Sequence, residues 1–284
     1  MTMTKPAALA VGVLAGERPG PSEIATAEDV PLKVMVDIAG TPMLGRVLDT
    51  VDAAFGDRPR LLAGPGAERL TQAPWLAERI ARTGVTHLEP TGSPSQSVRG
   101  LLSAARGAGA DALALTTGDH PLLLPETLSR FVSDAFATGA DAVVGLADHR
   151  AVQARFPHSR RTALRFADGF RCGCNLFLFR GAEADAVLDF WTRVEQDRKR
   201  PDRILKVLSP TLAVRYLAGR LPLADALRRL SELTGAQVAA VDVGDPDAAV
   251  DVDNVEDLAT VRARWRARSP QLDAADAGSG NENT

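Results

Sequence analysis

The sequence predicts an α/β fold with a mostly parallel sheet, helices on both of its faces and an added helical insert. In the first half of the chain, apolar runs alternate with helical patterns, as expected for strands joined by crossover helices. A long segment of helical spacing then interrupts this alternation, which resumes near the C-terminus. The 284 residues, 45% of them hydrophobic, suffice for the core of one large domain.

Each element of the first half has its own pattern. Five apolar runs predict strands at residues 9–15, 59–64, 85–90, 111–119 and 141–147. Apolar positions at helical spacing predict helices at residues 41–55, 67–83, 95–109 and 125–141. Pro74 is expected to break the second of these helices, whereas Pro125 suits the first turn of the fourth.

The second half departs from this alternation. Residues 160–180 predict two extended segments joined by an Ala-Asp-Gly turn, a hairpin-like excursion from the main sheet. Residues 181–235 are almost wholly helical in pattern, and 238–265 return to strand, loop and helix. We therefore expect a single domain over residues 1–268, with the insert at about 150–235. The tail, 269–284, has few apolar residues and is expected to be disordered.

Composition excludes several classes of function. Lys and Arg number 33 against 36 Asp and Glu, so a net charge of -3 gives no bulk reason to expect nucleic-acid binding. No run of roughly 18 uncharged apolar residues occurs, so no membrane-spanning helix is expected. The N-terminus lacks the apolar core of a signal peptide, and we expect a cytoplasmic protein.

Cys172 and Cys174 are expected to be reduced thiols, since a bridge between them would be strained and two ligands make a poor zinc site. Nothing predicts the oligomeric state.

The loop after the first strand, LAGERPG, is a candidate phosphate loop. Glycines such as Gly16 and Gly20 let backbone N–H groups approach phosphate oxygens, and Arg18 and Lys33 carry charges that would neutralise them. The sequence has neither GxGxxG here nor GxxxxGK[ST] anywhere, so a plain surface turn is an equal alternative on the glycine pattern alone.

Two further loops carry carboxylates where strands end, and such loops line the ligand crevice of an α/β sheet. Asp119, in TGDHP, follows the fourth strand and would suit magnesium, although it could instead cap a turn. Asp251 and Asp253 lie two residues apart before the last helix; one would serve as an N-cap and the other would need a cation or a lysine. These parts together favour phosphoryl or nucleotidyl transfer.

Five pieces occur in the order seen in a known family: LAG, PLKVMVDIAGTPMLGRVLD, SQSVRGLLSA, TGDHPLL and DVDNVEDL. They resemble the MobA-like nucleotidyltransferases, whose pattern runs LAAGxSxRMGxxK, LxGxPLL, a strand ending in Asp followed by xPxL, and DIDTPEDL. The resemblance covers residues 8–147 and 236–265. It implies the Rossmann-like fold of nucleotide-diphospho-sugar transferases, which GT-A glycosyltransferases share.

The resemblance also implies roles for individual residues. The nucleoside triphosphate would lie against Leu14, Ala15, Gly16, Arg18 and Gly118. Lys33 matches the signature lysine on the phosphates, and Ser95 or Ser97 would lie near the base or ribose. Asp119 matches the magnesium-binding aspartate, with Asp253 as the second metal-side carboxylate and Asp251 supporting it. Lys33 and Asp119 would be the catalytic residues. An acceptor phosphate or hydroxyl would attack the α-phosphorus and pyrophosphate would leave.

The sequence also departs from the family pattern. The first loop lacks the RMG run and places Lys33 further downstream, which leaves a non-catalytic nucleotide-binding regulator as an alternative. A GT-A glycosyltransferase is a second alternative, but its usual DxD at the fourth strand is TGD here. His120 has no assigned role.

The acceptor is expected to be a small molecule recognised by the insert. Asn175 would either bind a substrate hydroxyl or metal-bound water, or satisfy a turn. The stretch 191–233 mixes basic and apolar residues. It would face an amphiphilic acceptor or a membrane surface, or else its helices pack on the sheet with the basic side chains in water.

Overall fold

The computed structural model describes residues 8–17, 20, 22–159, 161–195, 207 and 209–279. Its strands are β1 (Leu9–Leu14), β2 (Asp37–Ile38), β3 (Thr41–Pro42), β4 (Arg60–Ala63), β5 (Thr86–Leu88), β6 (Ala112–Thr117), β7 (Ala142–Asp148), β8 (Leu164–Phe166), β9 (Gly169–Arg180) and β10 (Val238–Asp242). Its α-helices are α1 (Glu23–Ala27), α2 (Met43–Phe55), α3 (Ala67–Leu70), α4 (Pro74–Thr83), α5 (Pro94–Gly107), α6 (Pro125–Ala137), α7 (His149–Arg155), α8 (Ala184–Val194), α10 (Pro210–Leu217), α11 (Leu223–Thr234) and α12 (Val255–Ser279). Two 3₁₀ helices are η1 (Lys33–Met35) and η3 (Pro246–Ala249).

The main sheet has the order β10-β7-β9-β6-β1-β4-β5, with β8 paired to β9. Strands β1, β4, β5 and β6 run parallel to their neighbours in that half of the sheet, and β10 runs parallel to β7. This arrangement confirms the predicted fold class, a mostly parallel sheet with helices around it. The five strands and four helical segments expected in the first half of the chain all occur, including the break before Pro74.

Strand β9 corrects one expectation, because it is not part of an excursion from the sheet. It lies between β6 and β7 and pairs antiparallel with both. Its apolar side chains explain this position, since Leu176, Leu178 and Phe179 are at most 3% exposed and would not be buried in an isolated hairpin. Among the described strands of the main sheet, β8 alone lies outside the linear order, as the partner of β9 in a short hairpin.

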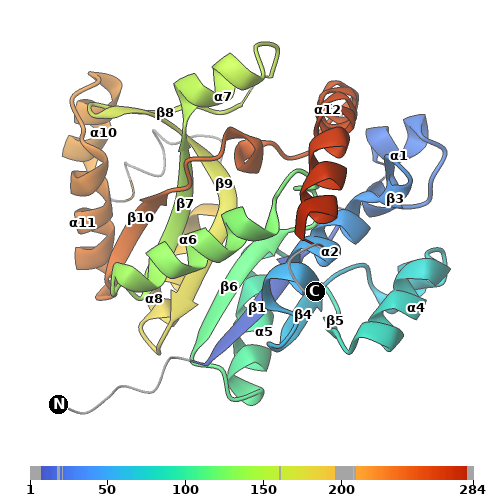
Figure 1. Cartoon of the computed structure of the whole chain (residues 1–284). Helices are drawn as coiled ribbons and strands as arrows, with labels where there is room; N and C mark the ends of the chain where they lie inside the picture. The colour runs from blue at the N-terminus through green and yellow to red at the C-terminus, as the bar shows by residue number, and fades with distance from the viewer. Residues whose placement is uncertain are drawn as a thin grey trace.

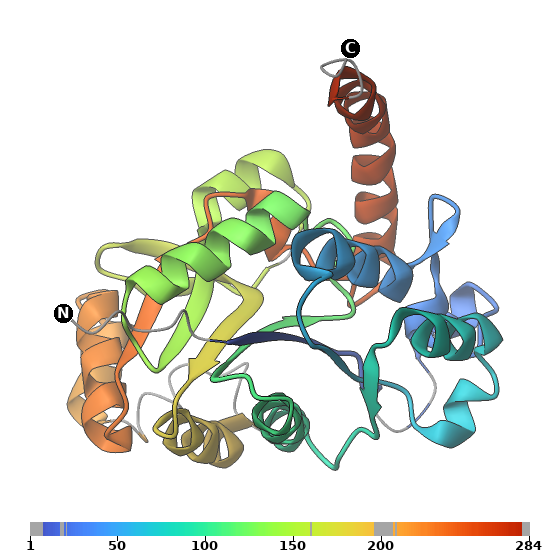
Figure 2. The ribbon, with the colours of Figure 1, turned by 60° about the horizontal axis from the view of Figure 1, so that its bottom comes forward.

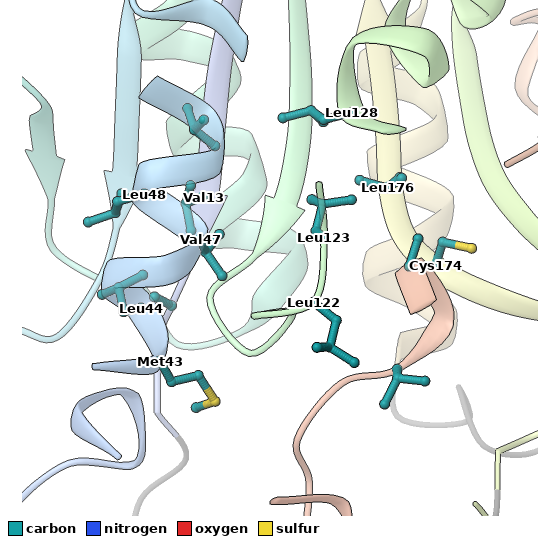
Figure 3. Close-up of a cluster of buried hydrophobic side chains, with 14 of the residues drawn as sticks. Val13, Met43, Leu44, Val47, Leu48, Leu122, Leu123, Leu128, Cys174 and Leu176 are labelled. Carbon is teal, nitrogen blue, oxygen red and sulfur yellow. The ribbon is translucent and has the colours of Figure 1, made fainter. Parts of the chain in front are cut away.

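Helices cover both faces of the sheet. Figure 2 shows α5 and α8 on one face and α2 and α6 on the other. The face under α2 and α6 holds a large buried cluster, part of which is drawn in Figure 3, with Leu44 and Val47 of α2 near Val13 of β1. Leu122 and Leu123 belong to the same cluster, although they lie in the loop after β6. This loop is therefore anchored in the core.

Helices α10 and α11 of the insert lie beside the β10 edge of the sheet, as Figure 1 shows. A separate apolar cluster joins α8, α10 and α11 through Phe190, Leu212 and Ala226. On the outer side of α10, Val214 and Leu217 are 66% and 70% exposed. The basic residues of segment 196–206 lie outside the described residues. Among the described helices, none is long and apolar enough to cross a membrane.

The last helix, α12, extends into the segment 269–284 that the composition predicts to be disordered. Helix α12 continues to Ser279, and Figure 2 shows its end projecting away from the sheet. The helix has a capped start, where Asn254 Oδ1 accepts from the N–H of Asp257 at 2.9 Å. Beyond Pro270, the alanines at 274, 275 and 277 have high intrinsic helix propensity. Residues 280–284 lie outside the described part.

Candidate active site

The site is built where β1 and β6 end side by side. Leu14 pairs with Thr117, and the N–H of Gly118 donates to the carbonyl of Leu14 at 2.9 Å. The segments that follow, Ala15–Gly16 and Gly118–Asp119, therefore leave the sheet next to each other. The residues predicted to contact the nucleotide, Ala15, Gly16 and Gly118, thus lie close to Asp119, the aspartate predicted to bind the metal.

Gly118 permits this close approach. A Cβ atom at position 118 would lie 2.8 Å from Cβ of Ala15 and 3.0 Å from Cδ1 of Leu44. The first of these neighbours has almost no freedom to move, because its Cβ is attached directly to the backbone of the loop after β1.

Gly118→Ala is expected to destabilise the fold by about 1–3 kcal/mol, the usual cost of overpacking a filled site. A thermal or urea unfolding experiment measures the change. Gly107→Ala at the end of α5 is the matched control, because no described atom beyond its chain neighbours and its own helix backbone lies within 4 Å of the added Cβ. A helical glycine replaced by alanine should be neutral or stabilising. Equal stability of the Gly118→Ala variant and the parent would contradict the packing argument.

Asp119 lies at the centre of a polar network. Its Oδ2 accepts from Lys33 Nζ at 3.0 Å, and its Oδ1 accepts from Thr117 Oγ1 at 2.7 Å. Burial by itself raises the pKa of the Asp119 carboxyl, but the charge of Lys33 and these hydrogen bonds outweigh burial and hold the pKa below its usual range. Asp119 is therefore an anion over the neutral pH range.

Lys33 reaches the site in spite of the long spacer that precedes it. Leu32, Val34 and Val36 are all buried around η1 and anchor this short helix in the core. The ammonium group then spans two carboxylates, since Nζ lies 3.0 Å from Asp119 Oδ2 and 3.4 Å from Asp253 Oδ1. The extra residues between β1 and Lys33 include α1, which folds back as an N-capped helical turn.

The loop before α12 supplies the other carboxylates. The N–H of Val252 donates to the carbonyl of Asp119 at 3.0 Å, which holds the two loops together. Among the described residues, Asp119, Asp251 and Asp253 each offer an oxygen, and these oxygens all lie within 4.8 Å of one another. The structure thus brings together Lys33 and the three aspartates predicted at the strand ends.

Two polar residues at the site, Arg161 and Asp257, are not among those predicted from the sequence. Arg161, from the segment before β8, forms ion pairs with Asp251 and with Asp257, the latter at 3.1 Å. Asp257 also accepts from the N–H of Asp253 at 3.1 Å, and its spacing of four residues from Asp253 before a helix could have indicated this. Nothing local could have indicated Arg161, which is 90 residues away from Asp251 in the sequence.

His120 and Asn175 form a second group, which contacts Asp251. His120 is 1% exposed, and its Nδ1 lies 3.1 Å from the carbonyl of Ala248. Asn175 Nδ2 lies 2.8 Å from His120 Nε2 and 3.3 Å from Asp251 Oδ2. Burial lowers the pKa of His120 to about 4, so the ring is neutral at neutral pH. The neutral ring therefore acts through its hydrogen bonds with Asn175 and Ala248.

The predicted nucleotide-side residues occupy different environments. Ala15 is buried and Gly16 is exposed at the end of β1, whereas Arg18 lies outside the described residues. Ser95 is fully buried at the start of α5, where its Oγ accepts from Thr192 Oγ1 at 3.0 Å. Ser97 is also buried, and its Oγ accepts from the N–H of Thr91 at 3.1 Å. Both serine hydroxyls therefore have partners within the protein.

The two cysteines lie on β9 as free, buried thiols. Burial raises the pKa of Cys172 to about 11 and raises that of Cys174 further. Neither thiol is in the group of possible metal ligands found among the described residues. The pair contributes to the core on the face covered by α6, where Figure 3 shows Cys174 near Leu176.

Comparisons with known proteins show relatives of the same fold. A hypothetical transferase from Thermus thermophilus is 28% identical, with a TM-score of 0.71 over 89% of this chain and 99% of that one. A CMP:2-keto-3-deoxy-manno-octonic acid synthetase complexed with CTP is 14% identical, with a TM-score of 0.54 over 93% of this chain and 100% of its own. A 4-diphosphocytidyl-2C-methyl-D-erythritol synthase from Anaerococcus prevotii is 13% identical, with a TM-score of 0.53 over 92% and 99% of the two chains. The latter two likenesses concern the fold.

Curated proteins give no match to the chain. The model of the MobA-like NTP transferase domain, however, matches residues 29–241, about three quarters of the sequence. This range includes Lys33 and Asp119 as well as the central strands β6, β7 and β9. The chain therefore belongs to the MobA-like NTP transferase domain family.

Proposed function

We propose that this protein is a magnesium-dependent nucleotidyltransferase, which transfers a nucleoside monophosphate from an NTP to a phosphate or hydroxyl oxygen of a small-molecule acceptor. The observation that carries the proposal is the bridging position of Lys33 between Asp119 and Asp253, at the joint end of β1 and β6. Family membership supports NTP transfer in general. The magnesium ion and the class of acceptor are part of the proposal.

The donor set fits magnesium. Among the described residues, four carboxylates, those of Asp119, Asp251, Asp253 and Asp257, are paired with two cations, Lys33 and Arg161. This leaves an excess of two negative charges in a partly buried cluster, which one divalent cation would balance. Carboxylate oxygens are the ligands that magnesium prefers, usually together with substrate phosphates and water. Asp119 and Asp253 would hold the ion with the support of Asp251.

The chain's own residues would then act on the triphosphate. Lys33 would bind phosphate oxygens through its ammonium group, and the backbone from Leu14 to Gly16 would lie against the nucleotide. Magnesium, when bound, would stabilise the negative charge that develops on the phosphates. Ser95 and Ser97 would support the start of α5 beside the base or ribose.

The proposed reaction is a single displacement. An acceptor oxygen forms a bond to the α-phosphorus of the NTP, and the bond from that phosphorus to the bridging oxygen of pyrophosphate breaks. The electron pair leaves with pyrophosphate, and a hydroxyl acceptor releases its proton to solvent. Because the acceptor attacks the phosphorus directly, no covalent enzyme intermediate is needed. We place the acceptor on the side of the insert, at about residues 150–235, because Arg161 and Asn175 reach the carboxylates from that part of the chain.

Pyrophosphate release tests the proposal. The protein is incubated with magnesium and each of CTP, GTP, ATP and UTP, together with a panel of phosphorylated and hydroxyl acceptors. Acceptor-dependent release from one NTP is the expected result. Tight NTP binding without release for any acceptor would favour a non-catalytic regulator, and sugar transfer from a nucleotide sugar would favour a glycosyltransferase. Either result would contradict the proposal.

Removal of divalent cations gives a second prediction. Treatment with EDTA is expected to stop pyrophosphate release, and added Mg²⁺ in excess of the chelator is expected to restore it. Mg²⁺ added without prior chelation serves as the control for effects on the assay. Release that continues at full rate in EDTA would show that the carboxylate cluster does not act through a metal.

A further inference from the structure

Asn175 has an unusual backbone for a residue within a strand. Its φ is 49°, in the left-handed region, and among the described residues other than glycine only Asp29 and Ala39 also have positive φ. It lies where the pairing of β9 with β7 shifts register between Val144 and Leu146. Asparagine tolerates this conformation better than most residues, but glycine adopts it at lower cost. Strain of this kind persists where the surrounding contacts fix the conformation.

The contacts of Asn175 define the direction of its side chain. A carboxylate only accepts hydrogen bonds, so the amide nitrogen and not the oxygen must face Asp251 Oδ2, at 3.3 Å. The same nitrogen donates to His120 Nε2 at 2.8 Å, which makes this ring nitrogen an acceptor. The ring proton is then on Nδ1 and donates to the carbonyl of Ala248 at 3.1 Å. Each donor in this series of hydrogen bonds therefore faces an acceptor.

Asp251 is held from two sides. One oxygen accepts from Asn175, while the other pairs with Arg161, whose guanidinium also reaches the backbone carbonyl of Asp251. We propose that Asn175 is a positioning residue of the active site, which keeps a carboxylate oxygen of Asp251 beside Asp119 and Asp253 against the pull of Arg161. This inference rests on the proposed metal-dependent function. Outer partners that orient the groups around a metal typically change its affinity by 10–100-fold when they are removed.

The test measures metal binding without turnover. Asn175→Gly removes the amide but suits a φ of 49°, so the variant is expected to fold, with a cooperative thermal transition. Mn²⁺ alone, which carboxylates bind much as they bind Mg²⁺, is titrated and followed by electron paramagnetic resonance. We expect Asn175→Gly to weaken Mn²⁺ binding about tenfold. Ala39→Gly is the matched control, because it relieves a similar backbone conformation in the turn between β2 and β3 and should bind Mn²⁺ like the parent.

A second variant separates positioning from a general structural effect. Asp251→Asn is expected to weaken Mn²⁺ binding, and adding Asn175→Gly to it should then cause little further loss, because Asn175 acts through Asp251. Parent-like Mn²⁺ affinity in Asn175→Gly or in Asp251→Asn would overturn the inference, as would full additivity of the two losses. A parent protein that binds no Mn²⁺ would contradict the metal site of the proposed function itself.

Discussion

Replacing Asp119 with asparagine is expected to lower the rate of acceptor-dependent pyrophosphate release by roughly three orders of magnitude. The substitution keeps the shape of the side chain but removes the charge that lies 3.0 Å from Lys33 Nζ. It also removes one of the three carboxylates whose oxygens lie within 4.8 Å of one another. Initial rates of pyrophosphate release at saturating NTP and acceptor measure the loss.

Asp57→Asn is the matched control for this experiment. Asp57 is 75% exposed and its ion pair is with the neighbouring Arg58, so its loss should leave the rate unchanged. Circular dichroism checks that Asp119→Asn keeps the parent's secondary structure. A folded Asp119→Asn variant with the parent's rate would refute the role given to this carboxylate.

Asp247→Ala is expected to destabilise the protein by about 3–5 kcal/mol, the usual cost of removing one partner from a buried ion pair. Its side chain is fully buried in η3 and pairs with Arg264 at 2.6 Å and with Arg268. Arg268 is itself buried and donates to the carbonyl of Leu122 at 2.7 Å. Removal of the carboxylate would leave two guanidinium groups without their shared partner. Urea unfolding of the two proteins gives the difference in free energy.

Asp225→Ala provides the comparison, because Asp225 also pairs with two arginines, Arg215 at 2.7 Å and Arg228 at 3.0 Å, but on the surface. Water can solvate those arginines after the substitution, so a much smaller loss is expected. Similar losses in the two variants would show that burial does not set the contribution of Asp247.

The carboxylate site was largely predictable because the positions at strand ends follow from local patterns. An apolar run that ends in Thr-Gly-Asp places Asp119 at the edge of a parallel sheet, and the aspartates before the last helix follow in the same way. The long spacer before Lys33 gave no indication of where this lysine lies. Its place depends on buried contacts of η1, which are set by tertiary packing.

The order of strands was less predictable than their existence. The sequence identifies 169–180 as extended, but pairing on both sides with β6 and β7 is a property of the assembled sheet. The contacts of Arg161 and Asn175 with Asp251 were not predictable for the same reason, since they form only after this part of the chain has returned to the centre of the molecule. The composition of 269–279 indicates little burial, and it carries no signal for the helix that the structure has there.

The central position of β9 has a consequence for the order in which the molecule assembles during synthesis. Strands β6 and β7 are made first, but they have no direct pairing with each other in the order of the sheet, and β9 fills the place between them. A nascent chain that ends before β9 would therefore hold the group β5-β4-β1-β6 with the edge of β6 unpaired and β7 still separate, because β10 is made only after β9. Such an edge favours association with other chains until it is covered. The ribosome must thus release β9 before the two halves of the sheet can join.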